Sequence, residues 1–226
     1  MRNLSIICLS FSLLFLIFSI TMVNDKSYDL LKIVVQWQPG MCSVPTKTCV
    51  KPKMNFTMHG IWPVKTSGKS MIHCNGCSLI PEQQLIDAVP NLIAYWPDVG
   101  KGDHYKFWEW EWNNHGKCSE QQLKQVDYFK LACQTLHDHD ILGILNQSHI
   151  FPNNQEVNRA DVTQAIQNKI TKVPLLICKK KAVNATTQPD QLVEVILCKD
   201  KTGGSFVNCP EKSKPNCPDK FLFSKL

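Results

Sequence analysis

The feature that most constrains this 226-residue chain is its set of cysteines, which follows an apolar leader. Residues 4–20 form an almost unbroken apolar run, LSIICLSFSLLFLIFSI, and charges return only at Asp25 and Lys26. This layout is typical of a secretory signal peptide, so we expect residues 1–27 to be removed. Removal takes away Cys8 and leaves an even number of cysteines, which in a secreted chain predicts disulfides. The remaining cysteines are Cys42, Cys49, Cys74, Cys77, Cys118, Cys133, Cys178, Cys198, Cys209 and Cys217.

Other features of the chain agree with export. Beyond the leader, three Asn-x-Ser/Thr sequons begin at Asn55, Asn146 and Asn184 and predict N-linked glycans in a secreted protein. An uncleaved membrane anchor is the alternative, but no later segment resembles a second membrane span. The formal net charge of +6 becomes +5 without residues 1–27. A moderately basic charge suits a polyanionic partner such as RNA, or an ordinary solubilising surface.

The hydrophobic pattern predicts one α+β domain over residues 28–226, a disulfide-bonded unit with an antiparallel sheet packed against several helices. Strand-like segments lie near both ends of the chain, and helical periodicity dominates the middle. Pro81 is expected to begin a helix that Pro90 interrupts, and Ser119 to cap the clearest helix. The expected strands are 30–37, 54–60, 173–178 and 191–198, and the expected helices are 81–89, 119–136 and 160–171.

The segment MNFTMHGIWPVK, residues 54–65, places a histidine on one of these strands. Its period-two alternation puts Asn55, Thr57 and His59 on the face opposite the apolar side chains. A glycan on Asn55 would lie roughly 13 Å from His59, at ~3.3 Å per residue, and need not cover it. A glycine follows the histidine directly, and Trp62 lies three residues beyond it.

A second segment, FWEWEWNNHGKC at residues 107–118, contains another histidine followed by glycine. Glu111 and His115 are four residues apart, so they share a face in either a helix or a strand, and the pattern leaves that choice open. Histidine titrates near neutrality, so two histidines can act as general base and general acid, with a carboxylate to assist. RNA suits this pair because its 2′-OH is an internal nucleophile and its bases stack on tryptophan. A purely structural histidine is the simpler alternative for each one alone.

A metal site is the competing interpretation of the central loop. Cys74-Asn75-Gly76-Cys77 is a C-x-x-C motif with His73 beside it, which in a cytosolic protein would indicate zinc. Behind a signal peptide, disulfides are the stronger interpretation. A thioredoxin-like redox site is weaker still, because the motif does not lie between a strand and a helix. We therefore expect no metal and no cofactor.

The segments VVQWQPGMC, NFTMHGIWPVK and FWEWEWNNHGKCS resemble, in this order and spacing, the blocks of the ribonuclease T2 family, and within it the plant S-RNases. The resemblance covers nearly all of the mature chain. It implies a metal-independent endoribonuclease that cuts single-stranded RNA to a 2′,3′-cyclic phosphate. His59 would be the general acid, His115 the general base, and Glu111 would assist at the phosphate. It also implies a monomer, secreted into the style, whose loops at 64–80 and 91–104 meet a pollen F-box protein.

The resemblance also assigns residues to substrate binding. Trp62 would stack on the first base, Gln36 would line the second base site, and Trp110 replaces a histidine that many relatives have. Asn114 stands where a lysine often helps to bind the phosphate, so electrostatic stabilisation should be weaker unless Lys117 compensates. Two alternatives to an S-RNase remain open. One is a housekeeping or defence ribonuclease that is also secreted, and the other is a basic glycoprotein that binds RNA or polysaccharide without cutting it.

The same resemblance implies a disulfide framework. Cys118 is expected to pair with Cys74 or Cys77, and Cys133 with whichever of these remains. We favour Cys74 as the partner of Cys118. The resulting pairs are Cys42–Cys49, Cys74–Cys118, Cys77–Cys133, Cys178–Cys217 and Cys198–Cys209.

Overall fold

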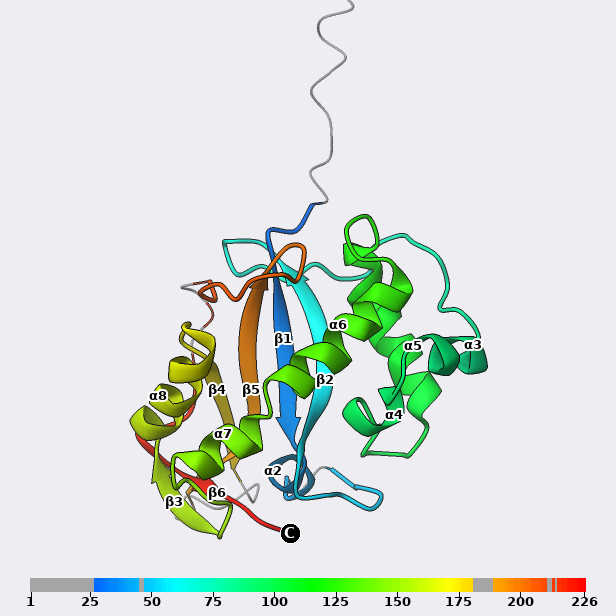
Figure 1. Cartoon of the computed structure of the whole chain (residues 1–226). Helices are drawn as coiled ribbons and strands as arrows, with labels where there is room; N and C mark the ends of the chain where they lie inside the picture. Colours follow the sequence, from blue (N-terminus) through cyan, green and yellow to red (C-terminus); the bar gives the residue numbers. More distant parts are fainter. Residues whose placement is uncertain (1–26, 45–46, 181–188, 211–212, 214) are drawn as a thin grey trace, which may run out of the picture.

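A mostly antiparallel sheet lies at the centre of the computed structural model (Figure 1). The structure describes residues 27–44, 47–180, 189–210, 213 and 215–226. The predicted signal peptide, except for its last residue, and the sequon at Asn184 therefore lie outside the described residues. β1 lies between β2 and β5, and β5 also pairs with β4 on its other edge and, through one parallel bridge, with β6. The strands are β1 (Leu30–Trp37), β2 (Phe56–Val64), β3 (Gln155–Asn158), β4 (Leu175–Lys180), β5 (Asp190–Asp200) and β6 (Lys220–Phe223).

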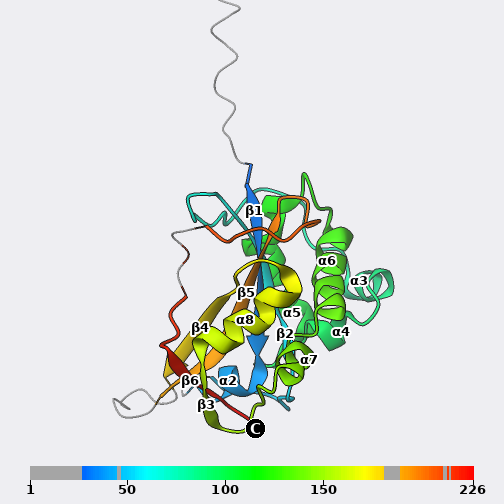
Figure 2. The ribbon, with the colours of Figure 1, turned by 60° about the vertical axis from the view of Figure 1, so that its left-hand side comes forward.

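Helices cover one face of this sheet. In Figures 1 and 2, α6, α7 and α8 run across that face, and α3, α4 and α5 gather beside β2. None of the helices in the described part of the chain is long and apolar enough to cross a membrane. The helices are α2 (Gln38–Cys42), α3 (Glu82–Ala88), α4 (Leu92–Tyr95), α5 (His104–Asn114), the 3₁₀ turn η1 (Gly116–Ser119), α6 (Gln125–Asp138), α7 (Ile141–Gln147) and α8 (Arg159–Ile170). The predicted α+β class is confirmed.

β1 is buried on both faces, which explains its continuous apolar sequence LLKIVVQW. Successive strand side chains point to opposite faces, so this segment supplies two cores. Ile33 and Val35 pack into the main core beneath the helices. Leu30 and Val34 pack into two smaller clusters on the opposite face. The central strand is therefore fixed from both sides, and its neighbours carry the candidate catalytic residues.

The tryptophan-rich segment is a helix, which settles the choice that its sequence leaves open. Asp103 caps α5, because its side chain accepts a hydrogen bond from the Lys106 amide at 3.2 Å. Trp108 and Trp112, one turn apart, are both fully buried. Trp110 points the other way and is 55% exposed. The alternating tryptophans therefore mark two faces of a helix rather than one face of a strand.

Ser119 does not cap the helix that follows it, so this prediction is wrong. Its hydroxyl donates to the Gly116 carbonyl at 2.7 Å and closes the 3₁₀ turn η1. The amides of Gln122 and Leu123 both donate to the Ser119 carbonyl at 2.8 Å, which makes another turn. α6 begins only at Gln125. A serine before an apolar periodic run suits a tight turn as well as a helix cap, because its hydroxyl can bond the backbone in either.

The structure contains four of the five predicted disulfides, and the Cys77–Cys133 pair is wrong: both remain free thiols. Cys77 is exposed on a loop, where its amide donates to Glu120 at 3.1 Å and its carbonyl accepts from Trp112 at 2.9 Å. Cys133 is buried on the core face of α6. A bridge would require the loop to break these bonds or Cys133 to leave the core. The pairs formed are Cys42–Cys49, Cys74–Cys118, Cys178–Cys217 and Cys198–Cys209.

Candidate active site

His59 lies at a β-bulge in β2. Gly60 and Met58 pair with consecutive residues of β1, so His59 has no partner on that strand. A bulge of this kind re-aims a side chain, and bulges are common beside active sites. The carbonyl of His59 accepts a hydrogen bond from the buried indole of Trp96 at 3.0 Å. The bulge also shifts the alternation of β2 by one residue, because Met58 and Ile61 both pack into the main core.

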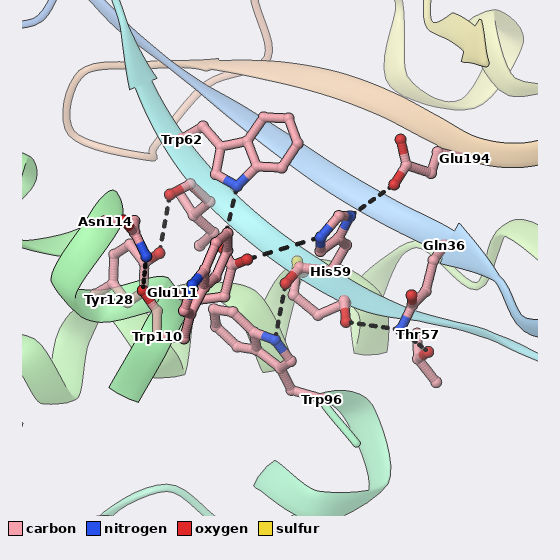
Figure 3. A network of polar contacts seen from close by, with 12 residues as sticks. Gln36, Thr57, His59, Trp62, Trp96, Trp110, Glu111, Asn114, Tyr128 and Glu194 are labelled. Carbon is pink, nitrogen blue, oxygen red and sulfur yellow. Dashed lines mark hydrogen bonds and ion pairs between the residues drawn. The ribbon is translucent and has the colours of Figure 1, made fainter. Parts of the chain in front are cut away.

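Glu111 reaches His59 from the facing helix α5 (Figure 3). Its side chain is fully buried, and its Oε2 accepts a hydrogen bond from the Trp62 indole at 3.1 Å. Its Oε1 lies 3.7 Å from His59 Nε2 and has no hydrogen-bond partner among the described residues. A side chain at position 60 would overlap this carboxylate, so Gly60 leaves the space that Glu111 occupies.

Trp62 joins the two predicted catalytic histidines. The centre of its ring system lies 5.3 Å from that of His59 and 5.1 Å from that of His115. The exposed ring of Trp110 lies 6.1 Å from His115 on the outer side. The structure therefore brings both histidines, Glu111 and two aromatic surfaces into one cluster, drawn from β2 and from α5 with its C-cap residue.

His115 follows the last turn of α5, where its amide donates to the Glu111 carbonyl at 2.9 Å. The helix geometry thus fixes the spacing between this imidazole and the carboxylate four residues earlier. A side chain at Gly116 would overlap the buried ring of Trp112. The glycine after each histidine therefore has the same use, since each makes room for a side chain of α5.

The two histidines have opposite electrostatic environments. Burial alone lowers the pKa of His59, but its hydrogen bond to Glu194 and the charges of Glu111 and Glu194 raise the pKa above its ordinary value. Burial lowers the pKa of His115 to about 4. The nearby His59 and His73 lower this pKa further, whereas a hydrogen bond with the backbone of Met71 raises it. Near pH 6, His59 therefore tends to hold a proton that His115 lacks, which is the division a general acid and a general base require.

Glu111 is a carboxyl group that can remain neutral in weakly acidic solution. Burial raises its pKa to about 7, although the charge of His59 and the Trp62 hydrogen bond oppose the shift. A neutral carboxyl carries one O–H donor, and its Oε1 is the oxygen without a hydrogen-bond partner among the described residues. It can therefore donate to a phosphate oxygen, whereas a carboxylate would repel a phosphodiester.

Glu194 belongs to the site, although sequence reasoning did not identify it. It lies on β5, directly opposite Gln36 of β1, and its Oε1 is 2.6 Å from His59 Nδ1. The segment LVEVILC predicts a strand, but nothing in it distinguishes this glutamate from an ordinary polar strand residue. The pairing of β5 with β1 and of β1 with β2 was needed to place it beside His59.

The predicted substrate-binding residues are only partly brought together. Gln36 is buried beside the site, with its Nε2 3.4 Å from Thr57 Oγ1 and 3.5 Å from the Met58 carbonyl. The side chain of Asn114 donates to the Trp110 carbonyl of its own helix at 2.8 Å. Lys117 does not join the cluster, because the 3₁₀ turn directs it toward the loop that contains Cys74 and Cys77.

Two of the three sequons lie in the described residues and differ in exposure. Asn55 is exposed immediately before β2, and its Oδ1 accepts a hydrogen bond from the next amide at 2.9 Å. Asn146 is half-buried near the end of α7, and its Oδ1 is buried. Asn55 is therefore the more accessible of the two predicted acceptor sites.

Known proteins are similar to this chain in sequence and fold. The family model of the ribonuclease T2 family matches residues 28–209. Ribonuclease S-6 of Pyrus pyrifolia is 33% identical over 90% of this chain and 89% of its own. Extracellular ribonuclease LE of Solanum lycopersicum is 29% identical over 82% of each chain. The solved structure of RNase NT in complex with 5′-AMP superposes with a TM-score of 0.79 at 27% identity, covering 88% of this chain and all of that one. This chain belongs to the ribonuclease T2 family and is a ribonuclease of the T2 type.

Proposed function

We propose that this protein cuts single-stranded RNA by transesterification, with His115 as general base and His59 as general acid. His115 takes the proton from the 2′-OH, and the 2′ oxygen attacks the adjacent phosphorus. The bond from phosphorus to the 5′ oxygen breaks, and His59 donates its proton to that leaving oxygen. The products are a 2′,3′-cyclic phosphate and a free 5′-OH, with no change in oxidation state and no requirement for a metal ion.

The observation that carries this proposal is the opposite shift of the two histidine pKa values around one shared indole. Two histidines in equivalent environments would populate both arrangements of a single proton equally, whereas opposite shifts favour the arrangement in which His59 is the acid and His115 the base. The rings of Trp62 and the exposed Trp110 lie next to this pair and can stack on RNA bases. Such stacking does not depend on which base is bound, since every base has an aromatic face. Glu111 supplies a donor toward the phosphate between them.

The test is a cleavage assay with the purified secreted protein in the presence of EDTA. A uridylyl-adenosine dinucleotide is compared with its 2′-deoxy counterpart, and His59→Ala and His115→Ala are assayed beside the wild type. We expect cleavage of the RNA alone, and a loss of ~10²–10⁴-fold in each variant, which is the usual contribution of general acid–base catalysis.

A second substrate separates the two roles. A uridine p-nitrophenyl phosphodiester has a leaving group that departs without protonation. His59→Ala should therefore recover most of the wild-type rate on this substrate, while His115→Ala should remain impaired. The opposite pattern would reverse the roles. RNA binding without cleavage by the wild type would instead support a non-catalytic glycoprotein.

We further propose that the ribonuclease is a secreted S-RNase that acts in the style during self-incompatibility. Ribonuclease S-6 supports this role, whereas extracellular ribonuclease LE supports the alternative of a housekeeping or defence enzyme. The loops at 64–80 and 91–104 would present allele identity to a pollen F-box protein. Transcript confined to styles would favour the first role, and transcript in leaves and roots would favour the second.

A further inference from the structure

The contact between Glu194 and His59 is the shortest that the catalytic histidine makes with a side chain. Glu194 Oε1 lies 2.6 Å from Nδ1, which is a charge-assisted hydrogen-bond distance, whereas Glu111 Oε1 lies 3.7 Å from Nε2. The glutamate side chain is 11% exposed and the histidine side chain is 25% exposed. Figure 3 shows the imidazole held between the two carboxyl groups, each facing a different ring nitrogen.

We infer that Glu194 is a positioning residue for the general acid, holding the proton on Nδ1 so that Nε2 is the nitrogen that gives its proton to the leaving oxygen. This inference rests on the role proposed above for His59. A carboxylate can only accept, so Nδ1 must be the donor in this contact. The hydrogen bond on one ring nitrogen thereby decides the function of the other. Glu194 acts through His59 and touches no reacting atom.

The strand framework makes Glu194 a rigid support. It lies in the middle of β5, which pairs with β1 on one side and β4 on the other. A side chain in a central strand has few alternative positions, so the Nδ1 contact also fixes the angle of the imidazole ring. Held in this way, His59 needs little reorganisation when the leaving oxygen arrives, which is the benefit of a preorganised site.

The other charges around His59 cannot replace Glu194. Glu111 approaches from α5, but burial raises its pKa to about 7, so it is largely neutral where a weakly acidic optimum is expected. Lys47, in the segment after α2, is positively charged and opposes protonation of His59, and His115 is neutral above its pKa of about 4. Glu194 is therefore the group that keeps the acid protonated while Glu111 is neutral.

The test combines two variants with a matched control. Glu194→Gln removes the charge and keeps the size, Glu194→Asp keeps the charge on a shorter side chain, and Glu156→Gln removes a charge from an exposed position on the distant strand β3. Nitrogen-15 NMR measures the pKa and tautomer of His59, and steady-state kinetics on the dinucleotide measure kcat and KM. The p-nitrophenyl substrate is assayed in parallel.

We expect Glu194→Gln to lower the His59 pKa and to move the alkaline limb of the kcat profile to lower pH. Its kcat should fall about tenfold on the dinucleotide, which is only a part of the ~10²–10⁴-fold contribution of general acid catalysis, with KM nearly unchanged. The loss should largely disappear with the p-nitrophenyl leaving group, Glu194→Asp should restore part of it, and Glu156→Gln should behave as wild type.

The inference is overturned if neutral His59 in the wild type carries its proton on Nε2, or if Glu194→Gln leaves the His59 pKa and the kcat profile unchanged. The tautomer of His59 is measured in the wild type, so this part of the test does not depend on whether a variant folds. If the wild type cuts no RNA, the proposed function fails, while the NMR titration still decides whether Glu194 holds Nδ1.

Discussion

At the scale of single residues, the proposed catalytic pair consists of two histidines whose surroundings differ. His59 and His115 contact the same indole, but only His59 has carboxyl groups at both ring nitrogens. His115 Nδ1 is buried with no hydrogen-bond partner among the described residues, and the backbone of Met71 only partly offsets the burial of a charge on this ring. The environment, rather than the side chain, assigns the roles.

These environments predict a pH profile for kcat/KM. His115 must be neutral to act as base, so activity should rise with pH up to its pKa of about 4. His59 must be protonated to act as acid, so activity should fall as pH passes its pKa, which lies above 6.5. The rate of dinucleotide cleavage at constant ionic strength measures both limbs. An acidic limb near pH 6.5 would contradict the buried, neutral base.

Glu111 can be tested as a neutral donor. Glu111→Gln keeps a donor and an acceptor in the same place, so it should retain activity within about tenfold near pH 5. Glu111→Ala removes the donor and should lose ~10²–10³-fold, the usual effect of deleting one such transition-state contact. Measurements of kcat/KM at pH 5 distinguish these outcomes. Equal losses in both variants would show that the charged carboxylate is required.

Sequence motifs predict residues of the site only where these residues are close to one another in the sequence. Glu111 and His115 are separated by one helical turn, so their spacing in the sequence already joins them. Trp62 likewise lies three residues from His59 on the same strand. Glu194 is 135 residues from His59, and only the order of the strands brings them together. Lys117 shows the converse, because it is near His115 in sequence but a tight turn directs it elsewhere.

At the scale of elements, the site depends on close contact between β2 and α5. The prediction is that Gly60→Ala places a methyl group against the Glu111 carboxylate and the Trp62 indole. Overpacking of this kind costs ~1–3 kcal/mol of stability. A displacement of Glu111 should also lower kcat/KM by up to ~10²-fold. Urea unfolding and dinucleotide cleavage measure the two effects.

Gly204→Ala is the matched control for this variant. An added Cβ there would meet Thr202 Oγ1 at 3.4 Å, an ordinary contact far from the catalytic cluster. Activity should remain at the wild-type value. If Gly60→Ala were also fully active, the packing of β2 against α5 would not be what positions Glu111.

The type of most elements follows from the sequence, while their ends depend on tertiary contacts. The apolar run of β1 and the periodicity of α8 predict these elements to within a residue. Period two also predicts β2, but it cannot reveal a bulge, because the shift of alternation after His59 depends on the partner strand. The strand β3, only four residues long and largely exposed, carries no clear pattern.

At the scale of the whole molecule, two disulfides should differ in their contribution to stability. Cys74–Cys118 spans 44 residues and joins the central loop to η1, whereas Cys42–Cys49 spans 7 residues. The chain-entropy model gives about 4 kcal/mol for the longer loop and about 2.5 kcal/mol for the shorter one. Replacement of each pair by alanine, in a Cys77→Ser background that prevents exchange, followed by urea unfolding, measures the difference. Equal losses would show that strain or local contacts dominate.

The two free thiols should differ in reactivity. Iodoacetamide should label Cys77 in the native protein, because this cysteine is exposed. Cys133 is buried, and burial raises its thiol pKa to about 12, so it should react only after unfolding. Peptide mass mapping with and without urea measures both. Absence of label at either cysteine after unfolding would restore the rejected Cys77–Cys133 bridge.

Because of the bulge in β2, the position of the proposed general acid His59 depends on the number of residues in the strand as well as on their identity. Deleting one residue at the bulge would let β2 pair continuously with β1, and the strand itself could remain intact. The imidazole of His59 would then be deleted or would point to another face of the sheet. Gly60 and Trp62 would also change position relative to Glu111 of α5, which they now contact. Loop insertions elsewhere in this enzyme should be tolerated far better than a change of one residue in this strand. A library of single-residue deletions across β2, assayed for both stability and RNA cleavage, should therefore contain variants that fold but do not cut RNA.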